Sequence, residues 1–249
     1  LLVSLLCQGS ALGAAAVPDE HWSRTEENGD YVTIRVPAAS DLQTADTFLL
    51  AVRYADTLEP VALSSVYLDG FLFATVPAAD ADRPLEVFRG DQPVWTDLEQ
   101  SYLAVQGADD LNIRGVILGD QAGRLKQDEP LTRAEAAVIA ARLLDLQPAG
   151  DPGYRDLSPE DWCYEAVSAV KAIGLGVDGD LLEPGQSVSR AEATVLMATL
   201  LEAVGWLEIP ETADLSGLSL ADAAAIPDWA AGAYQALWTC NQSVVISTE

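Results

Sequence analysis

The chain has 249 residues, which is enough for two ordinary domains with buried cores. Acidic residues outnumber basic ones 39 to 13, which gives a formal net charge of -26. Such an excess repels nucleic acid and anionic lipid, so we expect neither as a partner. Soluble, extracellular and halophilic settings all fit this acidity, and no stretch after the first residues has enough uninterrupted apolar residues to span a bilayer.

Residues 1–16 are uncharged and largely apolar, and they end in small residues. This pattern predicts the tail of a secretory signal peptide, with a buried strand or helix as the alternative. If the leader is removed, two cysteines remain, Cys163 and Cys240. Two thiols in an exported protein can pair, or each can be an independent buried side chain, and the sequence leaves both open.

Residues 17–93 predict a small antiparallel β domain, sandwich-like in form and of unknown role. Its β-rich runs are separated by Asp, Pro and Ala-Ala: 31–36, 47–54, 60–68 and 71–76. Asp69-Gly70 is the two-residue signal of a tight hairpin, because both residues tolerate positive φ. Three aromatic side chains are expected in the core rather than on an exposed sugar platform: Tyr67, Phe71 and Phe73.

From about residue 94 the pattern is helical and repeats with a period near 57 residues. Two stretches share a hydroxyl residue, then Arg-Ala-Glu, then an apolar run at helical spacing: LTRAEAAVIAARLL at 131–144 and VSRAEATVLMATLL at 188–201. Thr132 with Glu135, and Ser189 with Glu192, have the spacing of a capping box, in which each residue satisfies a backbone N–H of the other. We therefore predict two capped amphipathic helices.

A second pattern precedes each capped helix. It consists of an aromatic or apolar residue, one spacer and an Asp: Trp95-Thr96-Asp97, Tyr154-Arg155-Asp156 and Leu220-Ala221-Asp222. A helix is expected to start six or seven residues later, at Leu103, Trp162 and Trp229. Ser158 with Asp161 is expected to cap the second of these helices, and Gly115 and Gly174 are expected to end the first two.

Each unit is thus a helix, a loop and a helix, which cannot bury its own apolar stripe, so the units must pack together. The third copy lacks the glycine-rich loop and the Arg-Ala-Glu helix, which indicates a fragment or a degenerate repeat.

An arginine in the first turn of both capped helices is the unusual feature. The helix dipole makes this end positive, so a cation there costs roughly a few tenths of a kcal/mol unless a negative group is near. Arg133 and Arg190 are therefore expected to bind an anionic ligand. The alternative is an internal ion pair, such as Arg133 with Asp97 or Glu135, that only fixes the loop.

These motifs resemble the S-layer homology domain found on Gram-positive and related cell surfaces. The resemblance covers two full repeats and part of a third: 94–147, 152–207 and 216–249. It implies all-α helix-loop-helix repeats in a pseudo-threefold bundle. With the small β domain that the strand pattern predicts before them, we expect an α+β multidomain protein.

The resemblance also implies a function. Such domains hold exported proteins non-covalently on secondary cell-wall polysaccharide, often through pyruvylated N-acetylmannosamine, so we expect an extracellular protein at the cell wall or S-layer with a peptidoglycan-linked glycan as its partner. Self-assembly into a lattice stays open. The implied polysaccharide-binding residues are Arg133, Arg190, Asp97, Asp156, Trp162, Asp222 and Trp229. The acids are expected mainly to orient loops, and the alternative for the tryptophans is a place in the core.

The sequence does not predict an enzyme. His21 is the one imidazole of the chain, so a Ser-His-Asp or Cys-His site has a single candidate base. No zinc pattern or complete calcium loop occurs, and we expect no metal or other cofactor. The rival hypothesis is a wall-modifying hydrolase that carries the same anchor, with its catalytic part in the β domain or beyond the ends of the chain.

Overall fold

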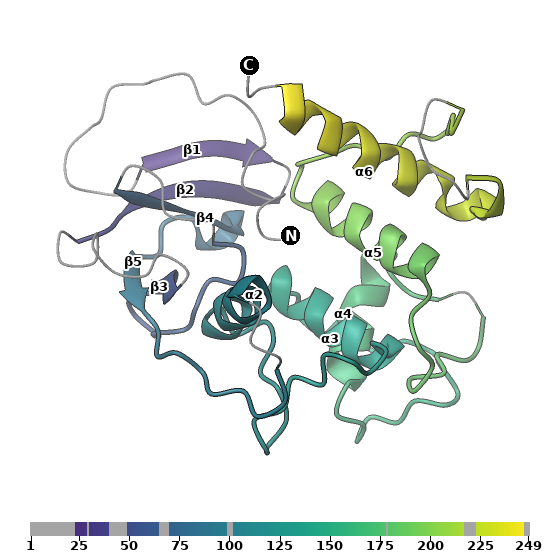
Figure 1. Ribbon diagram of the computed structural model, residues 1–249, viewed down its shortest axis with the longest axis horizontal. Coiled ribbons are helices and arrows are strands. Elements are labelled where there is room, and N and C mark those ends of the chain that lie inside the picture. Colours follow the sequence, from purple (N-terminus) through teal and green to yellow (C-terminus); the bar gives the residue numbers. More distant parts are fainter. Residues whose placement is uncertain are drawn as a thin grey trace. The chain divides into compact units, whose positions relative to one another are not determined.

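The computed structural model describes residues 23–28, 30–39, 49–64, 70–98, 102–177, 179–216 and 223–246 (Figure 1). The predicted leader and Asp222 lie outside these ranges. The chain divides into two compact units: Leu1–Glu129 with Arg142–Asp145, and Pro130–Ala141 with Leu146–Glu249. Strands precede helices along the described chain, so its composition is α+β as expected.

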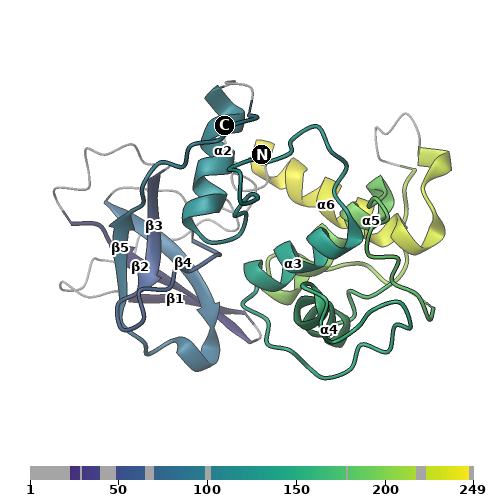
Figure 2. The same ribbon diagram turned by 90° about the horizontal axis from the view of Figure 1, so that it is seen from below.

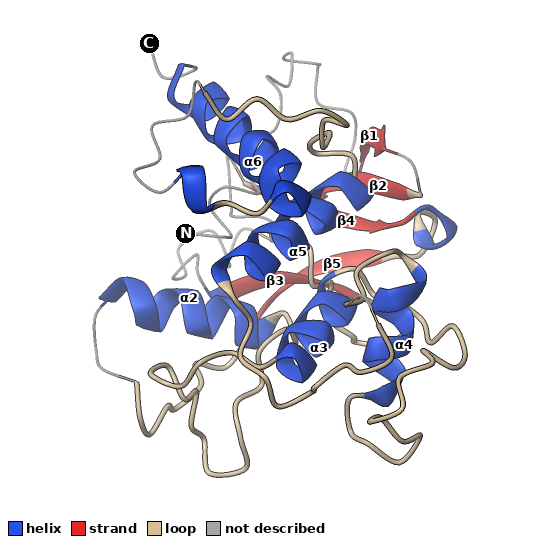
Figure 3. Cartoon of the chain, turned by 90° about the vertical axis from the view of Figure 1, so that its right-hand side faces the viewer, coloured by secondary structure: helices blue, strands red, loops and turns tan. Residues whose placement is uncertain are grey.

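The first unit contains two antiparallel sheets within its described residues (Figure 3). One has the strand order β1 (Ser23–Asn28), β2 (Tyr31–Pro37) and β4 (Phe71–Pro77), and the other pairs β3 (Leu50–Tyr54) with β5 (Leu85–Arg89). The prediction of a small antiparallel β region is confirmed.

Alternation along the strands decides which face is buried. Val32, Ile34 and Val36 of β2 are at most 1 % exposed, and they lie opposite Val76, Ala74 and Leu72 of β4, which are fully buried. Leu50, Val52 and Tyr54 of β3 belong to the same core cluster. The two sheets therefore share one hydrophobic core.

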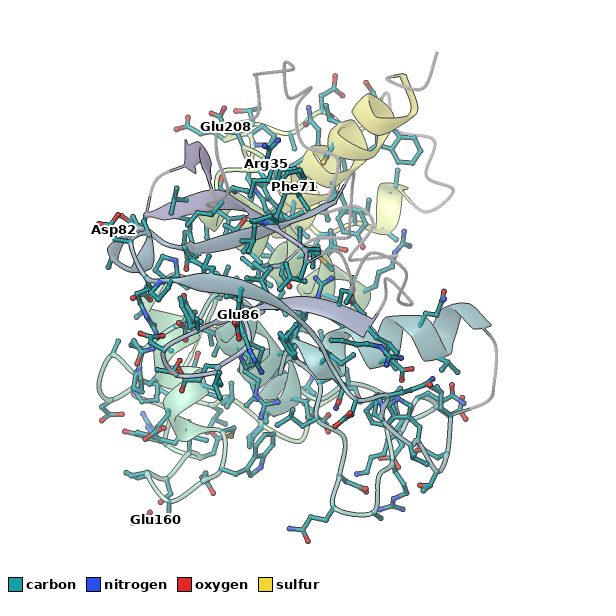
Figure 4. The ribbon with its side chains drawn as sticks, turned by 90° about the vertical axis from the view of Figure 1, so that its left-hand side faces the viewer. Arg35, Phe71, Asp82, Glu86, Glu160 and Glu208 are labelled. Carbon is teal, nitrogen blue, oxygen red and sulfur yellow. The ribbon has the colours of Figure 1, made fainter. Side chains whose placement is uncertain are left out.

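The prediction that Phe71 and Phe73 lie in this core is wrong. Both flank the buried Leu72 along β4, so the pleat turns them to the opposite face, where they are half-buried. The guanidinium carbon of Arg35, on neighbouring β2, lies 4.1 Å from the centroid of the Phe71 ring (Figure 4). Tyr67 lies outside the described residues.

The predicted run at 60–68 does not form a strand in its described part. Pro60 and Ser64 make only isolated bridges, to Arg53 and Ala74. Residues 65–69, and with them the Asp69-Gly70 turn, lie outside the described residues. Sequence reasoning also missed β1 and β5, since SRTEEN and LEVFR are short and show little apolar alternation.

Helix α2 (Tyr102–Ile113) belongs to the same unit as the sheets. Its last residue, Ile113, packs with Leu49, Ala51 and Phe88. Ala51 and Phe88 alternate with the core residues of β3 and β5, so α2 lies on the face of these strands that points away from the shared core (Figure 2). The first helix of the repeat region is thus packed on the β region.

The second unit is helical. It contains α3 (Arg133–Leu143) up to Ala141, together with α4 (Tyr164–Ala172), α5 (Arg190–Ala203) and α6 (Asp228–Ile246). The predicted stripe of α3 is buried at Ala134, Ala137 and Ala141, and α5 packs along α6. Within the described ranges, no helix combines the length and apolar character of a membrane span.

Glycines end α2 and α4 as predicted. Gly115 and Gly174 both adopt positive φ, and the next N–H donates to the carbonyl five residues back, from Val116 to Leu111 and from Leu175 to Val170. The start of α4 differs from the prediction. Asp161 Oδ2 accepts from the Ser158 N–H at 2.7 Å, but this closes a separate turn, and α4 begins only at Tyr164.

Candidate functional site

Both predicted capping boxes are present. In α5, Glu192 Oε2 accepts from the Ser189 N–H at 2.7 Å, and the Glu192 N–H donates to Ser189 Oγ at 3.2 Å. In α3, Glu135 Oε2 accepts from the Thr132 N–H at 2.9 Å, and the Glu135 N–H donates to Thr132 Oγ1 at 3.3 Å. The two arginine helices therefore begin in the same way, with the arginine directly after the capping residue.

Arg133 is bound by the chain itself. Its Nε and Nη2 donate to Glu192 Oε1 at 3.0 and 2.7 Å. Its Nη1 donates to the Leu182 carbonyl and to Glu183 Oε2, both at 3.0 Å. The side chain is 17 % exposed. The internal ion pair considered from the sequence exists, but its partners are Glu192 and Glu183 rather than Asp97 or Glu135.

The backbone of α3 is covered at the same end. The Arg133 N–H donates to the Gln186 carbonyl at 2.9 Å, and the Ala134 N–H donates to the Pro184 carbonyl at 3.1 Å. On the same loop, the Val188 N–H donates to the Leu131 carbonyl. Carbonyl oxygens of residues 184 and 186 thus occupy donors that could otherwise bind an anion.

Asp156 explains the shape of this loop. Its two carboxylate oxygens accept from the Leu182 N–H at 2.9 Å and the Glu183 N–H at 2.7 Å. Glu183 has φ 54, which is costly for a residue other than glycine and is offset here by these two bonds. Burial raises the pKa of the Asp156 carboxyl, but the two N–H donors lower it more, so it lies below its usual value.

Asp97 repeats this arrangement in the first unit. Its carboxylate oxygens accept from the Leu125 N–H at 2.8 Å and the Lys126 N–H at 2.7 Å, and Lys126 has φ 59. In both copies two successive loop N–H groups donate to the aspartate that follows the aromatic residue. The aspartate therefore fixes the loop. This is the role that the sequence favoured for these acids.

The aromatic residues that precede these aspartates also have internal partners. Trp95 Nε1 donates to the fully buried Asp109 at 2.8 Å, and the Tyr154 hydroxyl donates to the Val177 carbonyl at 2.8 Å. An added Cβ at Gly119 or Gly176 would lie 2.7 Å from the ring of Trp95 or the hydroxyl of Tyr154. The glycines of the loop therefore make room for the aromatic residue.

Arg190 is in a different environment from Arg133. The residue is exposed, and its guanidinium carbon lies 5.4 Å from the centroid of the Tyr234 ring on α6, within cation–π range.

The two tryptophans of the predicted site are on the surface. Trp162 is 69 % exposed just before α4, and Trp229 is 59 % exposed in the first turn of α6. The core alternative for these residues is therefore wrong. Asp222, the remaining predicted site residue, lies outside the described residues.

A cavity of about 80 Å³ lies next to the Arg133–Glu192 pair. Its walls are mostly apolar and come from α3, α4, α5 and the loop between the last two: Ala136, Ala137, Val167, Val170, Leu182, Val188 and Leu196. The ion pair thus lies at the edge of the helical core, where a low dielectric strengthens it.

Sequence reasoning missed Leu182 and Glu183, because a loop carbonyl and an acid with no helical periodicity give no recognisable signal. Glu192 was identified as a cap residue, but its second bond to Arg133 was not. Among the residues that the structure describes, the free cysteines are Cys163, which is buried, and Cys240, which is half-buried, so these two do not pair here. In the described residues, no three His, Cys, Asp or Glu side chains are placed to hold a metal ion.

No family model matches the chain. It is 33 % identical over 104 residues to the Surface-layer 125 kDa protein of Lysinibacillus sphaericus, which is 41 % of this chain and 9 % of that protein. It is 35 % identical over 104 residues to Outer membrane protein SlpA of Deinococcus radiodurans, 42 % of this chain and 8 % of that one.

A third relative is the Cellulosome-anchoring protein of Acetivibrio thermocellus, 34 % identical over 97 residues, which is 36 % of this chain and 22 % of that protein. The chain therefore matches less than a quarter of the length of each of these relatives. What it shares with S-layer and cell-surface anchoring proteins is a region of about 100 residues.

Proposed function

We propose that the helical repeats anchor an exported protein to the cell wall by binding an acidic secondary cell-wall polysaccharide. The observation that carries the proposal is the exposed Arg190 at the capped start of α5. The shared region with S-layer and anchoring proteins supports the same role. A pseudo-threefold arrangement of the repeats, implied by the family resemblance, is part of the proposal.

The chemistry fits a sugar that carries a carboxylate, such as a pyruvyl ketal. A planar guanidinium matches the geometry of a carboxylate, and the positive end of a helix favours the anion. The exposed tryptophans Trp162 and Trp229 offer flat apolar faces of the kind on which sugar rings stack. The overall charge of -26 does not prevent binding, because salt screens distant charges beyond about 8–10 Å.

Sedimentation with purified cell-wall sacculi tests the proposal. The protein is expected to sediment with untreated sacculi and to stay in solution after chemical removal of pyruvate. The Arg190→Gln variant is expected to bind at least about tenfold more weakly, which corresponds to about 1.4 kcal/mol. Equal retention before and after pyruvate removal would contradict the carboxylate mechanism.

Arg155→Gln is the matched control. Arg155 has a side chain that is 77 % exposed and paired with Asp180, so its loss makes the same charge change at an exposed residue that is not in a helix. We expect this variant to bind like the wild type. The proposal is of a binding module without catalytic activity, so release of soluble sugar fragments from the sacculi would favour the hydrolase hypothesis instead.

A further inference from the structure

We propose that three helices of the repeat region carry, at one equivalent position, a polar side chain that holds the preceding segment of the chain on the helix: Asp109 in α2, Ser168 in α4 and Gln235 in α6. Each lies six residues after the residue that marks the helix in its copy of the repeat: Leu103, Trp162 and Trp229. These bonds belong to the fold itself, so they do not depend on the proposed function.

Ser168 makes this contact in the second copy. It is 4 % exposed, and its Oγ accepts from the Ala149 N–H at 2.9 Å and donates to the Gly150 carbonyl at 2.6 Å. A hydroxyl can do both because it carries one donor and two lone pairs. A single side chain therefore holds on α4 the segment that leads into Tyr154-Arg155-Asp156.

Asp109 holds the corresponding segment of the first copy through different donors. It is fully buried, and its two oxygens accept from Trp95 Nε1 at 2.8 Å and from Gln92 Nε2 at 3.1 Å. An ionised carboxylate only accepts, so side-chain N–H groups satisfy it here. An added Cβ at Gly90 would lie 2.6 Å from the side chain of Ile113 on α2, so the segment also runs close against the helix.

Gln235 extends the arrangement to the third copy. Its Oε1 accepts from the Asp214 N–H at 2.7 Å. The same segment approaches α6 closely at a glycine, because an added Cβ at Gly232 would lie 2.9 Å from the Pro210 carbonyl oxygen. Two contacts of different kinds thus hold this segment on α6. The described start of the third copy is therefore built like those of the other two.

The shared feature of the three positions is an oxygen acceptor, while the residue type changes. Their hydrogen-bond partners lie 14 to 21 residues earlier in the chain, so no short motif contains both members. In the first two copies the held segment leads into the aspartate that fixes the loop, Asp97 or Asp156. Asp109 and Ser168 are therefore positioning residues for these loops.

Amide hydrogen exchange of Asp214 in the full chain tests the third copy. Gln235→Met keeps a side chain of similar length without the oxygen, so we expect this amide to exchange at least about fivefold faster. Gln235→Glu keeps an oxygen acceptor and is expected to restore exchange to within about twofold of the wild type. Unchanged exchange at Asp214 in Gln235→Met, or equally fast exchange in both variants, overturns the role of Gln235.

The second copy is tested with Ser168→Ala, in which the Ala149 amide is expected to exchange at least about tenfold faster because it loses a buried acceptor. Thr194→Ala is the matched control. It removes an exposed hydroxyl that donates to the Arg190 carbonyl of its own helix, and it should leave the Ala149 and Asp214 amides within about twofold of the wild type. Far-UV circular dichroism checks that each variant is folded. Equal acceleration at Ala149 and throughout α4 in Ser168→Ala would indicate general destabilisation and overturn the positioning role.

Discussion

The starts of α3 and α5 are built from nearly the same letters and have different surroundings. Both carry a hydroxyl cap, an arginine and a glutamate that completes the capping box. At α3 the loop of the following repeat contributes carbonyls and the Glu183 carboxylate, and the first turn of α5 contributes the Glu192 carboxylate, and together they enclose Arg133. At α5 the arginine is exposed and lies against Tyr234. The difference teaches that a repeated motif can enclose its arginine in one copy and leave it exposed to solvent in the other.

The largest expected effect separates the two arginines by stability. Arg133→Ala removes one partner of a partly buried ion pair and leaves two carboxylates facing each other, which should cost about 2–3 kcal/mol of unfolding free energy. Arg190→Ala removes an exposed side chain and should cost less than about 1 kcal/mol. Urea unfolding followed by circular dichroism measures both. Equal losses of unfolding free energy in the two variants would show that Arg133 is not held more firmly by the fold than Arg190.

A smaller effect is expected from the loop that encloses Arg133. Asp156→Asn replaces one of two charged acceptors by an amide N–H₂ group, so the Leu182 or Glu183 N–H loses its partner. We expect a loss of about 1–2 kcal/mol and faster hydrogen exchange at these two amides. Asp97→Asn is the matched variant, and it should affect the amides of Leu125 and Lys126 instead. Unchanged exchange at Leu182 would show that Asp156 does not hold the loop.

The caps should be equivalent even though their surroundings differ. Thr132→Ala and Ser189→Ala each remove a side-chain acceptor for the N–H three residues later and should each cost about 1 kcal/mol. Thermal unfolding of the two variants compares them directly. A much larger loss in Thr132→Ala would mean that the cap of α3 also supports the covering loop, and the two helix starts would then differ at the cap as well.

The last prediction concerns the stability of the fold at acidic pH, and no change is expected near neutral pH. Burial raises the pKa of Glu192, while the Ser189 N–H and hydroxyl and the Arg133 guanidinium lower it, and the net result is below the ordinary value of 4.5. The folded chain therefore binds this proton less readily than the unfolded chain. The stabilisation is fully present above about pH 4.5 and is lost as the pH falls through the lower folded value.

Denaturant midpoints between pH 3 and pH 7 check this dependence, with Glu192→Gln as the control. The variant has no carboxyl at this position, so its midpoint should fall less steeply on acidification. Parallel curves for the wild type and the variant would show that Glu192 is not preferentially ionised in the folded state.

Local sequence was sufficient for some of these features. The capping boxes at Thr132 and Ser189, the helix ends at Gly115 and Gly174, and the strands at 31–36 and 71–76 depend on neighbouring residues, and all were predicted. The prediction was wrong where a longer-range contact decides the outcome. Phe71 and Phe73 have core-like side chains, but the register of β4 against β2 gives the buried face to Leu72, Ala74 and Val76.

The sequence by itself therefore determined the repeats, their caps and their candidate arginines, because these are set by backbone groups within one turn. Only the tertiary structure decided that Arg133 is enclosed and Arg190 is exposed, since the partners of Arg133 lie 49 to 59 residues away in the chain. Whether a guanidinium is enclosed or exposed depends on which loop is packed over it. That packing follows from the fold of the neighbouring repeat and not from the residues beside the arginine.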